Sequence, residues 1–181
     1  KVGAGVSNVQ EGDHVVLAYA YCSHCHHCLE GIPAACTDWL ALNWGELHPD
    51  GTPFFTRDNG EVVRNFFHQS SFASHINVKA TNITQVDKDV DLRLVAPLAC
   101  GLMTGVGTVV NGLAVKPGSS IVIFGTGAVG LAAMMAAKIS GCTTIIAVDI
   151  HDARLTLAKE LGATHIILSL IHISEPTRPR L

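Results

Sequence analysis

Residues 121–135 read IVIFGTGAVGLAAMM, and this stretch decides the fold of the second half of the chain. Four apolar residues are followed by a segment with three glycines, Gly125, Gly127 and Gly130, and then by further apolar residues. The order predicts a strand, a tight turn and a helix, a context in which G-x-G-x-x-G indicates dinucleotide binding. Gly125 permits the turn, Gly127 lets the backbone approach a pyrophosphate, and Gly130 lets the helix pack on the strand. The helix N-terminus offers free N–H groups to the phosphates.

An acidic residue follows at the expected distance. The apolar run Ile145–Val148 ends in Asp149, about 20 residues beyond the turn, where a carboxylate bonds a ribose 2′-OH. The same carboxylate would repel the 2′-phosphate of NADP, so the sequence favours NAD. Arg154, five residues further on, either reaches the same ribose or is a solvated helix residue.

Strand and helix patterns alternate around this turn. Such alternation is typical of βαβ units with a parallel sheet, and we predict that residues 96–168 form the first half of a doubly wound α/β sheet. The predicted helices are Asp91–Gly101, Met103–Leu113, Ala128–Ser140 and Asp152–Leu161, and the predicted strands are Ser120–Phe124, Thr144–Val148 and one beginning at Ile166–Leu168.

Residues 1–95 show a different pattern, in which short apolar runs alternate with loops rich in Gly, Pro, Asn and Asp. This pattern predicts an all-β domain. The predicted strands are Val15–Ala18, Glu61–Phe67, Phe72–Val78 and Ile83–Val86.

Four cysteines gather in residues 22–36. Two-residue gaps allow a turn to point successive sulfurs at one metal, and a tetrahedral zinc site needs four such ligands. Disulfides and a redox Cys pair are the alternatives. Three histidines in the loop can compete as ligands, and we interpret them as solvated. The cysteines are Cys22, Cys25, Cys28 and Cys36, and the histidines are His24, His26 and His27.

Composition excludes several classes of protein. The formal net charge is -3 with no basic block, which argues against a nucleic-acid partner. Two uncharged stretches, Leu94–Val115 and Pro117–Ala137, have the hydropathy of membrane helices. The glycines and the change of period in the second favour buried elements of a globular domain, so we expect no membrane association. The opening at Lys1 has no secretory apolar region, and we expect an internal start of a cytoplasmic protein.

The last residues, 169–181, do not continue the alternation. Pro176 and Pro179 oppose the helix that should follow a third strand. The string resembles the translation of a transposase-type sequencing adapter, and we interpret it as a non-native tail. A natural disordered tail is the alternative.

Cys100 opens the sequence Cys-Gly-Leu-Met-Thr-Gly, and a lone Cys in an apolar helix is usually a small core residue. However, a four-Cys loop, a β-rich segment, this Cys-Gly helix and the glycine turn, in this order, resemble the zinc-dependent medium-chain alcohol dehydrogenases over Lys1–Leu168. The resemblance implies that residues 1–95 form a GroES-like domain and that the four-Cys loop holds a structural zinc. It also implies that Cys100 binds a catalytic zinc and that Thr104 packs near the nicotinamide.

A narrower resemblance, to the aryl-alcohol (benzyl-alcohol) dehydrogenase branch, rests on residues 65–73 and the Leu42-Asn43 region. It implies that Phe66 and Phe67 line a substrate cleft and face an aromatic alcohol. The alternative is that both belong to the β-domain core. His68 stands where the family usually has Gly.

The resemblance implies a parent enzyme, expected as a homo-oligomer, that moves a hydride from a zinc-bound primary, aromatic alcohol to NAD⁺ and gives an aldehyde. The family's other catalytic ligands and its proton-relay residue lie upstream of the position matching Lys1. The second half of its nucleotide sheet lies beyond Leu168. We therefore expect this chain to bind one zinc and to be inactive. The alternatives are a non-catalytic zinc-binding module and a zinc-free quinone reductase, against which the four-Cys loop argues.

Overall fold

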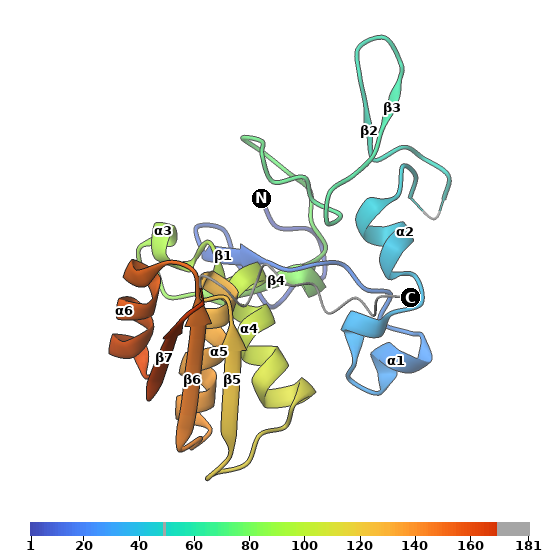
Figure 1. Cartoon of the computed structure of the whole chain (residues 1–181). Helices are drawn as coiled ribbons and strands as arrows, with labels where there is room; N and C mark the ends of the chain where they lie inside the picture. Colours follow the sequence, from blue (N-terminus) through green and yellow to red (C-terminus); the bar gives the residue numbers. More distant parts are fainter. Residues whose placement is uncertain (49, 170–181) are drawn as a thin grey trace, which may run out of the picture. The chain divides into compact units, whose positions relative to one another are not determined.

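The computed structural model describes residues 1–48 and 50–169 (Figure 1). Contacts divide the chain into two compact units, with the division between Ala96 and Pro97. Of the predicted non-native tail, Ser169 is described. It is buried, and its N–H donates to the Asp149 carbonyl at 2.9 Å. The rest of that tail, residues 170–181, lies outside the described residues.

The described strands of the first unit form two small antiparallel sheets. Strand β1 (His14–Leu17) pairs with β4 (Ile83–Val86), and β2 (Phe55–Thr56) pairs with β3 (Val62–Val63). In the first sheet His14 lies opposite Val86 and Leu17 opposite Ile83. The strands predicted at Val15–Ala18 and Ile83–Val86 are therefore confirmed to within one residue.

Two other predicted strands are wrong in extent or existence. Of Glu61–Phe67 only the two residues of β3 are extended and paired, and Phe72–Val78 forms no strand. A strand needs a partner for its backbone N–H and C=O groups, and within the described residues Phe72–Val78 has none. The Phe72 side chain is fully exposed accordingly.

Short helices connect these strands: α1 (His26–Leu29), η1 (Pro33–Ala35), α2 (Trp39–Trp44), η2 (Ala80–Asn82) and α3 (Leu92–Val95). None of them exceeds two turns, so tertiary contacts must hold them in place. The described residues of this unit bury more polar side chains than large apolar ones. The buried residues are Ala20, Cys36, Leu42, Asn43, Asn65, His68 and Asn82.

A three-stranded parallel sheet organises the second unit. The strands β5 (Ser120–Phe124), β6 (Thr144–Asp149) and β7 (His165–Leu168) lie in sequence order (Figure 1). Helices α5 (Ala128–Ile139) and α6 (Asp152–Leu161) make the crossovers. This is the predicted first half of a doubly wound sheet, and its core is apolar, with Val109, Ile121, Ile123, Met134, Ile145 and Leu155 at its centre.

Among the described residues, one face of this sheet is covered and the other is largely exposed. Burial alternates along β5, where Ile121 and Ile123 are buried while Val122 and Phe124 are exposed. All four residues of β7 are exposed. Within the described residues, the outer edges of β5 and β7 have no paired strand.

The segment Leu92–Gly112 forms a helical run that includes η3 (Leu98–Leu102), α4 (Met103–Gly107) and η4 (Thr108–Gly112). By length and composition alone it passes as a candidate membrane span, which is weak evidence because core helices pass the same test. At Gly105 the run packs closely on α5, since a Cβ there would lie 2.3 Å from the Val129 carbonyl oxygen. Helix α4 therefore contacts α5 backbone to backbone.

Candidate functional site

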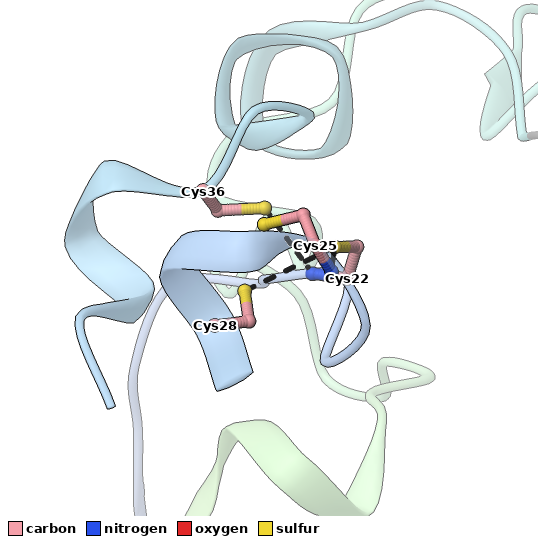
Figure 2. A group of neighbouring side chains, drawn as sticks. All are labelled: Cys22, Cys25, Cys28 and Cys36. Carbon is pink, nitrogen blue, oxygen red and sulfur yellow. Dashed lines mark hydrogen bonds between the residues drawn. The ribbon is translucent and has the colours of Figure 1, made fainter. Parts of the chain in front are cut away.

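The four-Cys loop brings its sulfurs together. Cys25 precedes α1, Cys28 lies within it, and Cys36 follows η1. The four Sγ atoms all lie within 4.8 Å of one another (Figure 2). The Cys22 and Cys28 sulfurs are 3.9 Å apart, and four thiolates at about 2.3 Å from one zinc would be about 3.8 Å apart. The spacing therefore fits one tetrahedral metal.

Backbone donors already stabilise negative charge on these sulfurs. The Cys25 N–H donates to the Cys22 sulfur at 3.2 Å, and the Cys22 N–H donates to the Cys36 sulfur at 3.3 Å. Backbone N–H groups of Thr37 and Cys28 lower the pKa of the Cys25 thiol to about 5. Lost hydration and the neighbouring Cys25 sulfur raise the pKa of Cys28 to about 12. Crowded thiolates repel, and a bound cation allows all four to ionise together.

The donor set is the one that zinc prefers. All six cysteines of the chain are described, and all are free thiols. His24 is exposed and shares a second possible metal-binding group with Cys22 and Asp38. His26 is also exposed and lies 3.2 Å from the Glu30 carboxylate. Four soft sulfur ligands suit zinc better than this mixed, exposed group does, so the loop residues fit the metal.

An aromatic cluster forms where α2 meets the segment after β3. The Trp44 ring lies edge-on to Phe66 with ring centres 4.9 Å apart, and 5.0 Å from the ring centre of Phe67. The Trp39 ring is 6.1 Å from Phe67. Phe66 is 50% exposed and Phe67 is half-buried. Both rings thus have one side packed, and Phe66 keeps a free surface that a pure core residue would not have.

His68 continues this segment in an unusual conformation. Phe67 and His68 have φ angles of 53° and 63°, in the left-handed region that favours glycine. The His68 N–H donates to Asn65 Oδ1 at 2.6 Å, and His68 Nδ1 lies 3.1 Å from the Leu42 carbonyl oxygen. Burial lowers the pKa of His68. The turn is one that glycine would adopt more easily, and hydrogen bonds hold it here.

The glycine turn has the geometry that a dinucleotide site requires. Gly125 has a φ of 86°, and a Cβ at Gly130 would lie 1.9 Å from the Gly125 carbonyl oxygen, so neither position accepts a side chain without a shift. A Cβ at Gly127 would meet nothing within 4 Å. Helix α5 begins at Ala128 with no side chain capping its first N–H groups. These donors face the open space at Gly127, which is where phosphates bind helix N-termini.

Asp149 lies beside this turn at the carboxyl end of β6. Its Oδ2 accepts hydrogen bonds from the Thr126 N–H at 2.6 Å and the Thr126 hydroxyl at 2.8 Å, and its Oδ1 accepts from the His151 N–H at 2.9 Å. These bonds lower the pKa of Asp149 to about 2, chiefly through the Thr126 N–H. A carboxylate has about four acceptor positions, so capacity for one more donor remains. Arg154 is exposed on α6.

Thr126 is the residue that sequence reasoning missed. It is fully buried and joins the glycine turn to Asp149. Its place in the G-x-G motif gave no signal of this role. The available hint was topological, because the carboxyl ends of adjacent parallel strands lie side by side.

Cys100 lies near the same turn in the second unit. Its helical segment is wide, with an i→i+5 hydrogen bond of 3.2 Å from the Leu102 N–H to the Pro97 carbonyl, a feature often found at functional sites. A Cβ on Gly101 would be 3.5 Å from the Ala128 Cβ, so the segment packs on the first turn of α5. Cys100 and Thr104 are both exposed. The predicted zinc ligand is therefore accessible and is held close to the glycine turn.

Comparison with known families gives two matches. Residues 1–88 match the family described as an alcohol dehydrogenase GroES-like domain. Residues 128–177 match the family described as a zinc-binding dehydrogenase.

Individual proteins agree with these matches. Geraniol dehydrogenase of Castellaniella defragrans is 39% identical over 167 residues, 92% of this chain and 45% of that protein. A crystal structure of an alcohol dehydrogenase zinc-binding domain protein from Burkholderia ambifaria superposes with a TM-score of 0.86 and 49% identity, covering 95% of this chain and 47% of the other. Benzyl alcohol dehydrogenase of Acinetobacter calcoaceticus superposes with a TM-score of 0.82 and 45% identity, covering 92% and 45%. The chain spans about half the length of the relatives it matches.

Proposed function

Because the chain belongs to the zinc-dependent medium-chain alcohol dehydrogenase family, we propose that the whole protein oxidises an alcohol by transferring a hydride to NAD⁺. The carbinol carbon gives its hydride to the nicotinamide ring, the hydroxyl proton leaves to solvent, and an aldehyde is released. Zinc and NAD are the cofactors standard for this family. The observation that carries the proposal is the convergence of four sulfurs within 4.8 Å, in a chain that also contains the glycine turn and Asp149.

The residues of the four-Cys loop would hold a structural zinc. Four protein ligands fill a tetrahedral coordination sphere and leave no position for substrate. This metal therefore contributes folding free energy and takes no part in the chemistry.

Cys100 would supply one ligand of a second, catalytic zinc. When bound, such a zinc lowers the pKa of the alcohol oxygen as a Lewis acid. The packing of Gly101 on Ala128 keeps Cys100 close to the first turn of α5, where the dinucleotide would bind. Thr104, four residues later on the same helical run, would pack near the nicotinamide.

The glycine turn and Asp149 would select NAD. The N–H groups at the start of α5 would bind the pyrophosphate, while Gly125 and Gly130 fix the turn and Gly127 leaves it open. Thr126 keeps Asp149 ionised, because its two hydrogen bonds stabilise the carboxylate. A charged Asp149 accepts a ribose hydroxyl and repels a 2′-phosphate. Arg154 can approach the same ribose from α6.

The substrate would be a primary aromatic alcohol. Phe66 and Phe67 present edge-packed aromatic faces, and aromatic rings pair favourably with aromatic ligands. The relative named for benzyl alcohol supports an aromatic alcohol, whereas the relative named for geraniol supports only a primary alcohol.

The whole protein, expressed with the residues that flank this chain in its gene, tests the proposal. It should reduce NAD⁺ with benzyl alcohol and should use NADP⁺ poorly. Failure to reduce NAD⁺ with any member of a broad alcohol panel would contradict the enzyme assignment. Reduction of quinones with NADPH would instead favour a zinc-free reductase of the same superfamily.

The 181-residue chain provides a second test. We propose that it binds one zinc and has no turnover, because among its described residues only Cys100 matches a catalytic-zinc ligand. Metal analysis with activity assays checks this. Two zinc ions per chain, or measurable turnover, would show that a catalytic site survives, whereas one zinc without turnover is also what a non-catalytic zinc module would give. We further propose that the whole protein is a cytoplasmic homo-oligomer, which fractionation and sedimentation can check.

A further inference from the structure

We propose that Asn43 is a positioning residue that couples zinc binding in the four-Cys loop to the placement of Phe66 and Phe67. The inference rests on the proposed roles of that loop as a zinc site and of the two aromatic residues as substrate contacts. Asn43 is fully buried in the last turn of α2. Its side chain bonds to Ala20 and Trp39, and its backbone carbonyl bonds to Phe67.

The Asn43 side chain forms hydrogen bonds at both ends of the four-Cys loop. Its Oδ1 accepts from the Ala20 N–H at 2.8 Å, and its Nδ2 donates to the Ala20 carbonyl at 2.9 Å. Ala20 lies two residues before Cys22. The same Nδ2 donates to the Trp39 carbonyl at 2.8 Å, and the Trp39 N–H donates to the Cys36 carbonyl at 3.0 Å. One amide thus holds the segment that enters the loop and the helix that leaves it.

The Asn43 backbone forms a hydrogen bond with the aromatic segment, which comprises Phe66, Phe67 and His68. Its carbonyl accepts from the Phe67 N–H at 2.8 Å. The Phe67 and His68 residues have left-handed φ angles, which L-residues rarely adopt, so the segment depends on such bonds to keep its shape. Asn65 adds two further bonds: its Oδ1 accepts from the His68 N–H, and its Nδ2 donates to the Gly45 carbonyl at 2.8 Å.

Side-chain packing also links the four-Cys loop to Phe66 and Phe67. Trp39, three residues after Cys36, has its ring 6.1 Å from Phe67, and Trp44 packs against Phe66 and Phe67. Helix α2 therefore carries contacts to the zinc loop at its first turn and contacts to the aromatic segment along its length. A short helix held at both ends moves as one body, so an ordered loop and an ordered aromatic segment stabilise each other. Such coupling is reciprocal by linkage.

Asn65 makes the proposal testable, because its side chain bonds to the aromatic segment and to Gly45 and to no atom of residues 22–36. Zinc affinity of the 181-residue chain is measured by competition with a chromophoric chelator. We expect Asn65→Ala to weaken zinc binding at least about fivefold, and Asn43→Ala to weaken it about tenfold or more. Because both act through one connection, the double variant should be little weaker than Asn43→Ala alone.

Asn82→Ala is the matched control. Asn82 is equally buried in the same unit, and its side-chain oxygen accepts from the Thr81 hydroxyl and not from any residue of the loop; its backbone bond to the Ala18 N–H is kept in the variant. It should leave zinc affinity unchanged. Near-UV circular dichroism of the zinc-loaded variants checks that each is folded. Where Asn43→Ala does not fold, Asn43→Asp replaces it, since it keeps the acceptor for Ala20 and removes both donors.

Fluorescence tests the coupling in the reverse direction, from zinc binding to the aromatic segment. The chain has two tryptophans, so Trp39→Phe leaves Trp44 as the reporter beside Phe66 and Phe67. Removing zinc from this variant should shift Trp44 emission, and adding zinc back should restore it. Unchanged Trp44 emission, or Asn65→Ala behaving like Asn82→Ala, overturns the coupling while leaving the zinc site intact. A chain that binds no zinc overturns both the coupling and the proposed structural site.

Discussion

Replacing Gly105 with Ala tests the direct contact of α4 with α5. The added Cβ would lie 2.3 Å from the Val129 carbonyl oxygen, 2.7 Å from the Ala133 nitrogen and 2.8 Å from the Ala132 Cβ. Two of these atoms belong to the backbone and cannot rotate away, so the helices must separate. Overpacking costs about 1–3 kcal/mol, while Ala in place of helical Gly gains about 0.5–1 kcal/mol. The net expectation is a loss of about 1–2 kcal/mol.

Hydrogen exchange followed by mass spectrometry measures this loss where it occurs. Peptides from α4 and α5 should exchange about tenfold faster in Gly105→Ala, since about 1.4 kcal/mol corresponds to a factor of ten. Gly107→Ala is the control, because it lies in the same helix and its Cβ would meet nothing within 4 Å. It should slow exchange slightly through helix propensity alone. If hydrogen exchange is as slow in Gly105→Ala as in Gly107→Ala, α4 does not pack closely on α5.

Four further predictions follow from the same structure. The depressed pKa of Asp149 means that its carboxylate stabilises the fold above about pH 4 and that this stability is lost as the pH falls towards 2. Asp149→Asn should therefore lower the free energy of unfolding in urea by roughly 1–2 kcal/mol at pH 7, allowing for solvent screening, and by almost nothing at pH 2. Gly127→Ala should leave folding unchanged but weaken NAD binding to the whole protein about tenfold by calorimetry, because its Cβ enters the space where phosphates approach. Phe124→Lys should reduce self-association in sedimentation, because Phe124 is 80% exposed on the uncovered face of the sheet. Chelating zinc should abolish exchange protection in β1 and α2 while leaving that of α5 unchanged, and equal loss in both units would contradict their independence.

The second unit could be predicted from the sequence almost element by element. Strand Ser120–Phe124 has the predicted bounds, and α5 ends at Ile139, one residue before the predicted end. The signals there are local: an apolar run, a glycine turn and a change of period. The β-rich unit was less predictable, because strand pairing depends on residues far apart in the chain. The apolar run Phe72–Val78 predicted a strand, but the described residues supply no partner for it.

The candidate site shows the same division between local and distant information. The cysteine spacing predicted the convergence of sulfurs because a short loop constrains where its ligands can lie. Thr126 and Asn43 could not be found in this way. Each forms its decisive hydrogen bonds with a residue 23 positions away, and a single Thr or Asn in a sequence does not show such a partner.

The difference between the two units also supports the proposed metal site in the first. The second unit buries a continuous apolar cluster, which supplies the usual driving force for folding. In the described residues of the first unit the buried side chains are mainly amides and one imidazole, with Leu42 as the one large aliphatic group. Hydrogen bonds give directional order but little net free energy, so this unit needs a further source of stability. Four thiolates around one zinc would provide it, and under our proposal Asn43 would pass that order on to the residues that it contacts.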